Sequence, residues 1–243
     1  MCTLVAAVGQ FPGYPLVVAA NRDERLDRAA SPPRLWPGTT PFIAPRDEVA
    51  GGTWLGVNAR GLFVGITNRF GVPVDPQRRS RGQIVVEALA APSARELHSR
   101  MARFPAEEFN PFHLLYADAE DAFVTWFDGQ ARQQAELGRG VHVVTERSLG
   151  GDDKARSELI REYWRGIDVS GPPPVERLEG LLKLHGKDPV GGTCVHVPAF
   201  NYGTRSSLVL LQSEKPEERR FIWAEGAPHQ ATFEDRSGLL REL

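Results

Sequence analysis

The first half of the chain alternates short apolar runs with turn-forming residues, a pattern typical of antiparallel strands. Two pairs of such runs, each joined by a turn signal, predict β-hairpins over residues 2–21 and 53–67. The turn of the first hairpin is centred on Pro12-Gly13. The segment 29–45 between the hairpins holds five prolines and is expected to be a long connection without strands.

Helical spacing of apolar residues begins after the second hairpin. Residues 80–91 carry their apolar side chains on one face, and Ser93 with Glu96 forms a capping box that opens a second helix. Two more helices are expected, one capped by Asp152 and Asp153 and one over residues 175–184. Further strands are predicted at 112–117, 122–127, 141–145, 193–197, 204–212, 221–225 and 231–234. Strands that return after helices predict a layered α+β fold, and no shift in composition divides the single domain 1–243.

Composition excludes several classes of protein. The 243 residues are 41% hydrophobic and 25% charged, with a formal net charge of −2. A nucleic-acid partner is not expected, because no basic excess is available to neutralise phosphates. The longest aliphatic runs fall far short of the ~20 residues that span a bilayer. The N-terminus lacks the features of a signal peptide, so we expect a cytoplasmic protein; its oligomeric state cannot be read from the sequence.

Cys2 is the first candidate for catalysis because it follows the initiator methionine. Cells remove Met1 when the second side chain is small, which would place a thiol and a free α-amine on one residue. An α-amine with a pKa near ~7.7–8.0 can accept the thiol proton at neutral pH, so no histidine base is needed. The alternative is that Cys2 is a small apolar residue at the start of a strand.

The predicted register of the first hairpin places charged groups beside Cys2. With the turn signal at the centre, Cys2 lies opposite Asp23, and Arg22 is its neighbour. The Asp23 carboxylate would hold the α-ammonium group, and the Arg22 guanidinium would lower the pKa of the thiol. The alternative is that residues 21–24 form a solvated turn.

Two further polar residues are candidates. Asn68 is expected opposite Gly51-Gly52, where the missing side chains leave room for a substrate, and its amide would donate to an oxyanion. As an alternative, Asn68 is an ordinary turn residue at a strand end. Arg205, which precedes an apolar strand, is either a cation that faces the substrate or an exposed edge charge.

These residues belong to motifs that occur in a characteristic order along nearly the full chain. The motifs are Cys2-Thr3, Asn21-Arg22-Asp23-Glu24, Gly51-Gly52-Thr53-Trp54-Leu55-Gly56, Thr67-Asn68-Arg69 and Tyr202-Gly203-Thr204-Arg205-Ser206-Ser207. In this combination the chain closely resembles the NRDE family, the relatives of transport and Golgi organisation protein 2. The resemblance implies an N-terminal nucleophile hydrolase near the penicillin V and bile-salt acylases, with a four-layer αββα sandwich.

The resemblance also implies roles for individual residues. Cys2 matches the nucleophile, Arg22 and Asp23 the pair beside it, Asn68 an oxyanion-hole residue and Arg205 the late active-site arginine. The candidates for substrate binding are Asn21, Trp54 and Asn201.

The function implied is that of an amidohydrolase that cleaves a small, linear, non-peptide amide and requires no cofactor. One alternative is a haem carrier, because members of the family are implicated in intracellular haem trafficking. Arg22 or Arg205 would then meet the propionates, and Trp54 or Phe63 would line the rings. Glu146, near the place of a further asparagine in the acylases, keeps this alternative open. Another alternative is an interaction module without chemistry.

A metal site is not expected from the spacing of ligand residues. The six histidines are scattered without a ligand motif, and His142 and His196 are interpreted as packed strand histidines. Cys194, within an expected strand, is interpreted as a core thiol, and neither cysteine lies in a haem-attachment motif. The expected partner is therefore a small molecule, either an amide or haem.

Overall fold

A computed structural model describes residues 2–149 and 154–243 of the chain. Its contacts divide the chain into two compact units, each assembled from separate stretches of sequence. Unit 1 comprises Met1–Arg28, Arg139–Val143 and Asp152–Gly238, and unit 2 comprises Ala29–Gly138, Val144–Gly151 and Leu239–Leu243. The single-domain organisation stays a prediction. Among the described helices, none combines the length and the apolar composition that crossing a bilayer requires.

Unit 1 is built on a sheet with the strand order β10-β1-β2-β12-β13-β14, and the short strand β11 pairs with β12. Strand β2 is antiparallel to both β1 and β12. The strands are β1 (Cys2–Phe11), β2 (Tyr14–Arg25), β10 (Gly140–Thr145), β11 (His196–Val197), β12 (Tyr202–Gln212), β13 (Arg220–Glu225) and β14 (Glu234–Asp235). The helices are α3 (Lys154–Arg165) and α4 (Val175–Leu182), with short 3-10 turns at Pro198–Phe200, Pro216–Glu218 and Ser237–Glu242.

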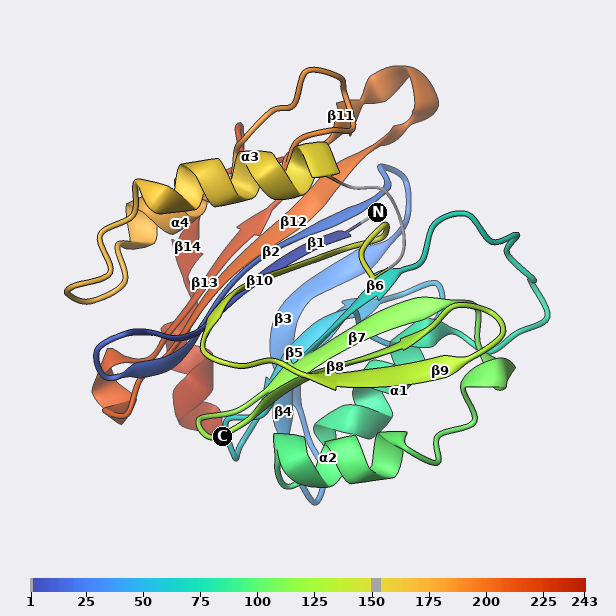
Figure 1. The fold of residues 1–243 in the computed structure, drawn as a ribbon, viewed down its shortest axis with the longest axis horizontal. Coiled ribbons are helices and arrows are strands. Elements are labelled where there is room, and N and C mark those ends of the chain that lie inside the picture. The colour runs from blue at the N-terminus through green and yellow to red at the C-terminus, as the bar shows by residue number, and fades with distance from the viewer. Residues whose placement is uncertain (1, 150–153) are drawn as a thin grey trace. The chain divides into compact units, whose positions relative to one another are not determined.

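Helices α3 and α4 cover one face of this sheet (Figure 1). Successive side chains of a strand point to opposite faces, so alternate residues of β1, β2 and β12 face the helices. Val5, Val17 and Val209 pack there against Ile160 of α3 and Leu181 of α4. This alternation decides which polar side chains at the strand ends lie on the helix side and which lie on the other face.

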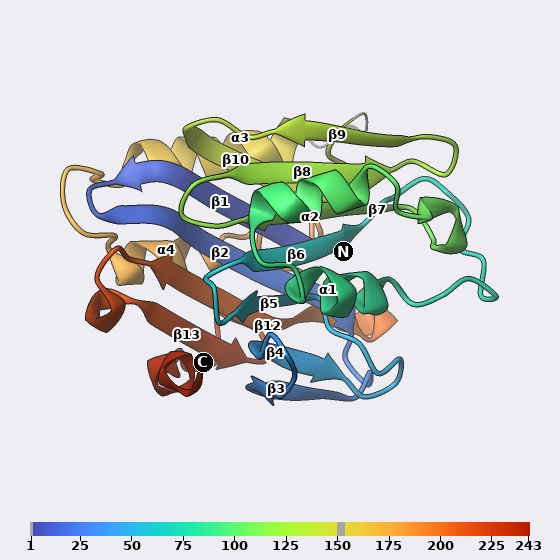
Figure 2. The same cartoon turned by 90° about the horizontal axis from the view of Figure 1, so that it is seen from below.

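Unit 2 contains a sheet with the order β3-β4-β5-β6-β7-β8-β9. Helices α1 and α2 lie over its strands (Figure 2), and Val85 and Leu97 from these helices pack against Val64 and Leu114 of the sheet. The strands are β3 (Ala30–Trp36), β4 (Phe42–Asp47), β5 (Leu55–Asn58), β6 (Phe63–Asn68), β7 (Phe112–Ala117), β8 (Ala122–Phe127) and β9 (Arg132–Glu136). The helices are α1 (Arg81–Leu89) and α2 (Ala94–Met101), with a 3-10 turn at Ala106–Glu108.

Local sequence signals set the ends of several elements as predicted. The Ser80 side chain caps α1 by accepting from the Gly82 N–H, and Ser93 caps α2 by accepting from the Glu96 N–H. Strands β7 and β8 have the predicted bounds. The predicted caps of the next helix, at residues 152 and 153, lie outside the described residues.

Two predictions in unit 2 are wrong. The proline-rich segment 29–45 contains strands β3 and β4. Pro32 and Pro33 are tolerated in β3 because it is an edge strand, and its pairing with β4 is irregular between Ser31 and Arg34. The turn signal Asp128-Gly129 predicted a connection from strand 122–127 to strand 141–145. It leads instead from β8 into β9, a polar strand that has no apolar pattern.

Candidate functional site

The pairing of Cys2 differs by one residue from the prediction. Cys2 begins β1 and pairs with Arg22 of β2, rather than with Asp23. The register shifts between Val8 and Phe11, where β1 has one residue more than β2. Gly9 lies in this bulge with a φ of 60°, a conformation that glycine adopts without strain. The extra residue moves every pair beyond it by one position.

The half-buried Cys2 thiol and the buried Arg22 side chain lie on the face of the sheet opposite the helices. Arg22 pairs next with Ser206 of β12, and its Nη2 is 3.7 Å from Oε2 of Glu24. Burial raises the pKa of Cys2, and the Asp23 carboxylate adds to this rise, whereas the Arg22 charge opposes it. Arg22 therefore acts in the predicted direction, but burial outweighs it and the net pKa is raised, so the thiol needs a base to become a nucleophile at neutral pH.

The Asp23 carboxylate is buried and held in place by Thr204. Its Oδ1 accepts a hydrogen bond of 2.6 Å from Oγ1 of Thr204, and its backbone oxygen accepts one of 2.9 Å from the Tyr202 hydroxyl. The N–H of Val195 donates to the Thr204 hydroxyl oxygen at 2.9 Å and so orients it. Thr204 belongs to a motif recognised in the sequence, but its role as the partner of Asp23 required the pairing of β2 with β12.

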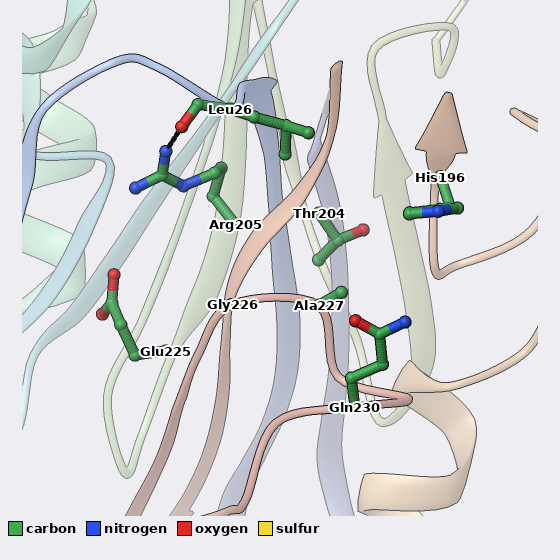
Figure 3. Close-up of a pocket in the computed structure, with 8 residues that line it drawn as sticks. All are labelled: Leu26, His196, Thr204, Arg205, Glu225, Gly226, Ala227 and Gln230. Atoms are coloured by element: carbon green, nitrogen blue, oxygen red, sulfur yellow. Dashed lines mark hydrogen bonds between the residues drawn. The ribbon is translucent and has the colours of Figure 1, made fainter. Parts of the chain in front are cut away.

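Arg205 lies where the pairing of β12 with β2 is interrupted, between Thr204 and Ser206. Its guanidinium donates to the backbone oxygen of Leu26, and it lines a cavity of about 450 Å³ together with Thr204 and Glu225 (Figure 3). The wall of this cavity therefore carries both a cation and a carboxylate. The remaining lining residues are Leu26, His196, Gly226, Ala227 and Gln230, and Cys2 is not among the residues that line it.

Two candidates for substrate binding have structural roles. Both amide hydrogens of the buried Asn21 are used, in bonds of 2.9 Å to the Leu182 oxygen and 2.8 Å to the Thr193 oxygen. Asn201 is exposed and has a φ of 50°, and its backbone oxygen accepts from the Leu26 N–H at 2.8 Å. The amide of Asn21 and the backbone of Asn201 thus stabilise unit 1, and substrate binding by either residue stays a prediction.

Asn68, Trp54 and Glu146 belong to unit 2. Asn68 ends β6, pairs with Phe112 and is exposed. Trp54 is half-buried and packs against the core of this unit. Glu146 is buried, with its Oε1 3.9 Å from Nε of Arg147. The oxyanion role of Asn68 and the substrate role of Trp54 stay predictions.

Of the two glycines Gly51 and Gly52, only Gly51 has the open space that was predicted for a substrate. Gly51 has a φ of 78° and forms a turn. A Cβ on Gly52 would lie 2.5 Å from the carbonyl carbon of Gly82, at the start of α1. The close backbone approach predicted for a substrate at Gly52 is therefore made by the protein itself.

A buried histidine in unit 2 was not singled out by any sequence pattern. Nδ1 of His113 is 3.0 Å from Oγ1 of Thr67, and its Nε2 is 3.0 Å from Nη1 of Arg69 and 2.9 Å from the Ser148 oxygen. Burial, followed by the Arg69 charge, lowers the pKa of His113 to about 4. His113 is therefore a neutral, hydrogen-bonded part of the core at pH 7.

His113 should make the protein less stable in mild acid. Its folded-state pKa of about 4 lies below the ordinary value of 6.5, so the unfolded chain gains the proton first as the pH falls. The contribution of His113 is fully present above pH ~6.5, and about 3 kcal/mol of it is lost on going to pH ~4. In urea unfolding across this range, His113→Gln should show a shallower loss of stability than the wild type. An unchanged slope would contradict the assignment.

Comparison with known proteins shows similarity along most of the chain. The family described as Transport and Golgi organisation 2 matches residues 1–224. The Transport and Golgi organization protein 2 homolog of Bos taurus is 30% identical over 228 residues, which cover 82% of this chain and 82% of that protein.

Two solved structures share the fold. A variant of the conjugated bile acid hydrolase of Clostridium perfringens gives a TM-score of 0.63 at 12% identity, covering 98% of this chain and 93% of that one. Penicillin V acylase from Agrobacterium tumefaciens gives a TM-score of 0.55 at 14% identity, covering 99% and 88%. The predicted fold class, an α+β fold of the N-terminal nucleophile hydrolase type, is thereby confirmed.

Proposed function

Because the chain belongs to the Transport and Golgi organisation 2 family and has the fold of N-terminal nucleophile hydrolases, we propose that it is a cysteine amidohydrolase that cleaves a small, non-peptide amide. The observation that carries the proposal is the place of Cys2. It is the first residue of β1, it pairs with Arg22, and the next residue of β2, Asp23, is held by Thr204.

The first chemical step is acylation of Cys2. After removal of Met1, the α-amine of Cys2 accepts the thiol proton, and the sulfur attacks the amide carbonyl carbon. The tetrahedral intermediate collapses when the α-ammonium returns the proton to the leaving nitrogen, so an amine departs and a thioester remains. Because burial raises the pKa of the thiol, the scheme depends on the α-amine as the base that takes its proton.

Hydrolysis of the thioester completes the cycle. The α-amine takes a proton from water, the hydroxide attacks the thioester carbonyl, and the sulfur leaves and regains a proton. Asp23 orients the amine, and Arg22 favours the developing thiolate. Arg205 supplies a cation in the cavity for a polar or anionic part of the substrate. The scheme requires no cofactor.

Haem binding receives less support from the described residues. One of the aromatic residues expected along the rings, Phe63, is fully buried and offers no ring face to a ligand. Trp54 is half-buried and packs against the core of unit 2. The amidohydrolase therefore remains the function that the geometry favours.

The proposal predicts an acyl-enzyme on an N-terminal cysteine. Intact mass spectrometry should show that Met1 is absent, and a short N-acyl amide should add its acyl mass to the protein during turnover. Peptide fragmentation should place the acyl group on Cys2, and Cys2→Ala should abolish both the adduct and the release of amine. Retention of Met1 in protein from a normal bacterial host would sink the proposal, as would turnover that survives in Cys2→Ala.

A further inference from the structure

Three side chains that favour metal ions come together in unit 1, although they are distant in sequence. The ligand atoms of His185, Cys194 and His229 all lie within 4.8 Å of one another. The thiol is buried and the two imidazoles are exposed. We propose that these three residues bind a divalent metal ion of the zinc class, Zn²⁺, and leave a fourth coordination position open to solvent.

The distances suit a tetrahedral ion after a small adjustment. With Zn–N bonds of about 2.0–2.1 Å and a Zn–S bond of about 2.3 Å, tetrahedral ligand atoms lie about 3.3–3.6 Å apart. Sγ of Cys194 is already 3.2 Å from Nδ1 of His229. The side chain of His185 is exposed, so rotation of its side chain can close the remaining distance.

The loop after α4 folds back on itself, which brings Cys194 close to His185. The N–H of Cys194 donates to the Leu184 oxygen at 3.0 Å, which closes the loop. Glycine is needed where the backbone crosses itself: a Cβ on Gly192 would lie 2.4 Å from the Leu184 oxygen, and one on Gly186 would lie 2.6 Å from the Gly192 nitrogen. Two ligands are thus held by a tightly folded backbone, as preorganised metal sites require.

The third ligand comes from the turn after β13. The N–H groups of Gln230 and Ala231 both donate to the Ala227 oxygen, at 2.9 and 2.8 Å, and fix the turn that carries His229. The His229 ring packs edge-on against His185, at 5.1 Å between centroids, and against His196, at 5.5 Å.

The donor set decides the class of metal. Thiolate and imidazole ligands favour zinc and similar transition metals, whereas Mg²⁺ and Ca²⁺ prefer oxygen. Three protein ligands satisfy a tetrahedral ion except for one position, which water can fill. His196 and Gln230, which flank His229 in space and in sequence, line the cavity that contains Arg205 (Figure 3). A metal ion here would add positive charge at the border of that cavity.

Metal titration of the full-length protein tests the proposal. Protein freed of metal under reducing conditions should bind one equivalent of Zn²⁺ in competition with a chromophoric chelator. With Co²⁺ as the probe, it should show a thiolate-to-cobalt charge-transfer band and the strong visible bands of tetrahedral Co²⁺. Cys194→Ser should remove the charge-transfer band, and His185→Gln and His229→Gln should each weaken Zn²⁺ binding by at least about 10–100-fold.

Matched variants make the outcome specific. Cys2→Ser and His142→Gln make the same chemical changes outside the cluster and should leave Zn²⁺ affinity unchanged. Cys194→Ser alters a buried side chain and could unfold the protein. His185→Gln and His229→Gln replace exposed side chains and should keep the fold, as checked by circular dichroism, so they test the site in either case. Absence of stoichiometric binding, or a charge-transfer band that depends on Cys2, would overturn the site. If His196→Gln lowered Zn²⁺ affinity as much as His185→Gln does, His196 would be a fourth protein ligand. The proposed open coordination position would then be wrong. Each result is independent of amide hydrolysis.

Discussion

Replacement of Asp23 by asparagine should lower amide turnover by about 10²–10⁴-fold, the usual cost of a misplaced acid or base. The carboxylate is expected to hold the α-amine of Cys2, and the uncharged amide would not. The fold should survive, because the Oδ1 of asparagine can still accept the 2.6 Å hydrogen bond from Thr204. Amine release from a short N-acyl amide measures the effect, with circular dichroism as the check on folding.

The same variant separates an amidohydrolase from a haem carrier. Removing a negative charge near anionic propionates should leave haem affinity unchanged or raise it slightly, as followed by visible absorbance. Asp27→Asn is the matched control, because Asp27 is 53% exposed and pairs with Arg25. Equal turnover in the two variants would contradict the role of Asp23. Haem binding in a wild type that hydrolyses no more amide than Cys2→Ala would favour the carrier.

The Gly52→Ala variant should lower the free energy of unfolding by about 1–3 kcal/mol, towards the upper end of this range. The new Cβ would meet the carbonyl carbon of Gly82 at 2.5 Å and its oxygen at 2.7 Å. Backbone atoms cannot rotate away as a flexible side chain can, so either α1 or the segment before β5 must move.

Urea unfolding measures this effect, and Gly38→Ala is its control. A Cβ on Gly38 would meet nothing within 4 Å, so that variant should stay within about 0.5 kcal/mol of the wild type. If the two variants unfold at the same urea concentration, the close approach between Gly52 and Gly82 does not constrain the fold.

Apolar patterning predicted most of the elements because burial of one face leaves a periodic trace in the sequence. Helices α1 and α2 and strands β7 and β8 carry this trace together with clear caps or turns. Strand β9 has no such trace, because its side chains are largely polar and it lies at the sheet edge. Strand β3 was concealed by Pro32 and Pro33, which an edge strand tolerates.

The candidate site was predictable where neighbours in sequence remain neighbours in space. Cys2, Arg22 and Asp23 were identified by motif and hairpin, but the pairing of Cys2 depended on a bulge at Gly9 that apolar patterning does not encode. The contact of Asp23 with Thr204 required a strand from the other end of the chain. The cluster of His185, Cys194 and His229 depends on the return of two loops, so no spacing rule could predict it.

The division of unit 1 into distant stretches of sequence sets an order of events on the ribosome. Strands β1 and β2 are made first, whereas β12, which pairs with the free edge of β2, begins only at Tyr202. Most of unit 2, Ala29–Gly138, is synthesised in the interval. Domains assemble while the chain is still growing. During this interval the hairpin of β1 and β2 therefore lacks β12, the strand that pairs with β2. In the proposed mechanism, the terminus that must lose Met1 is therefore synthesised before β12.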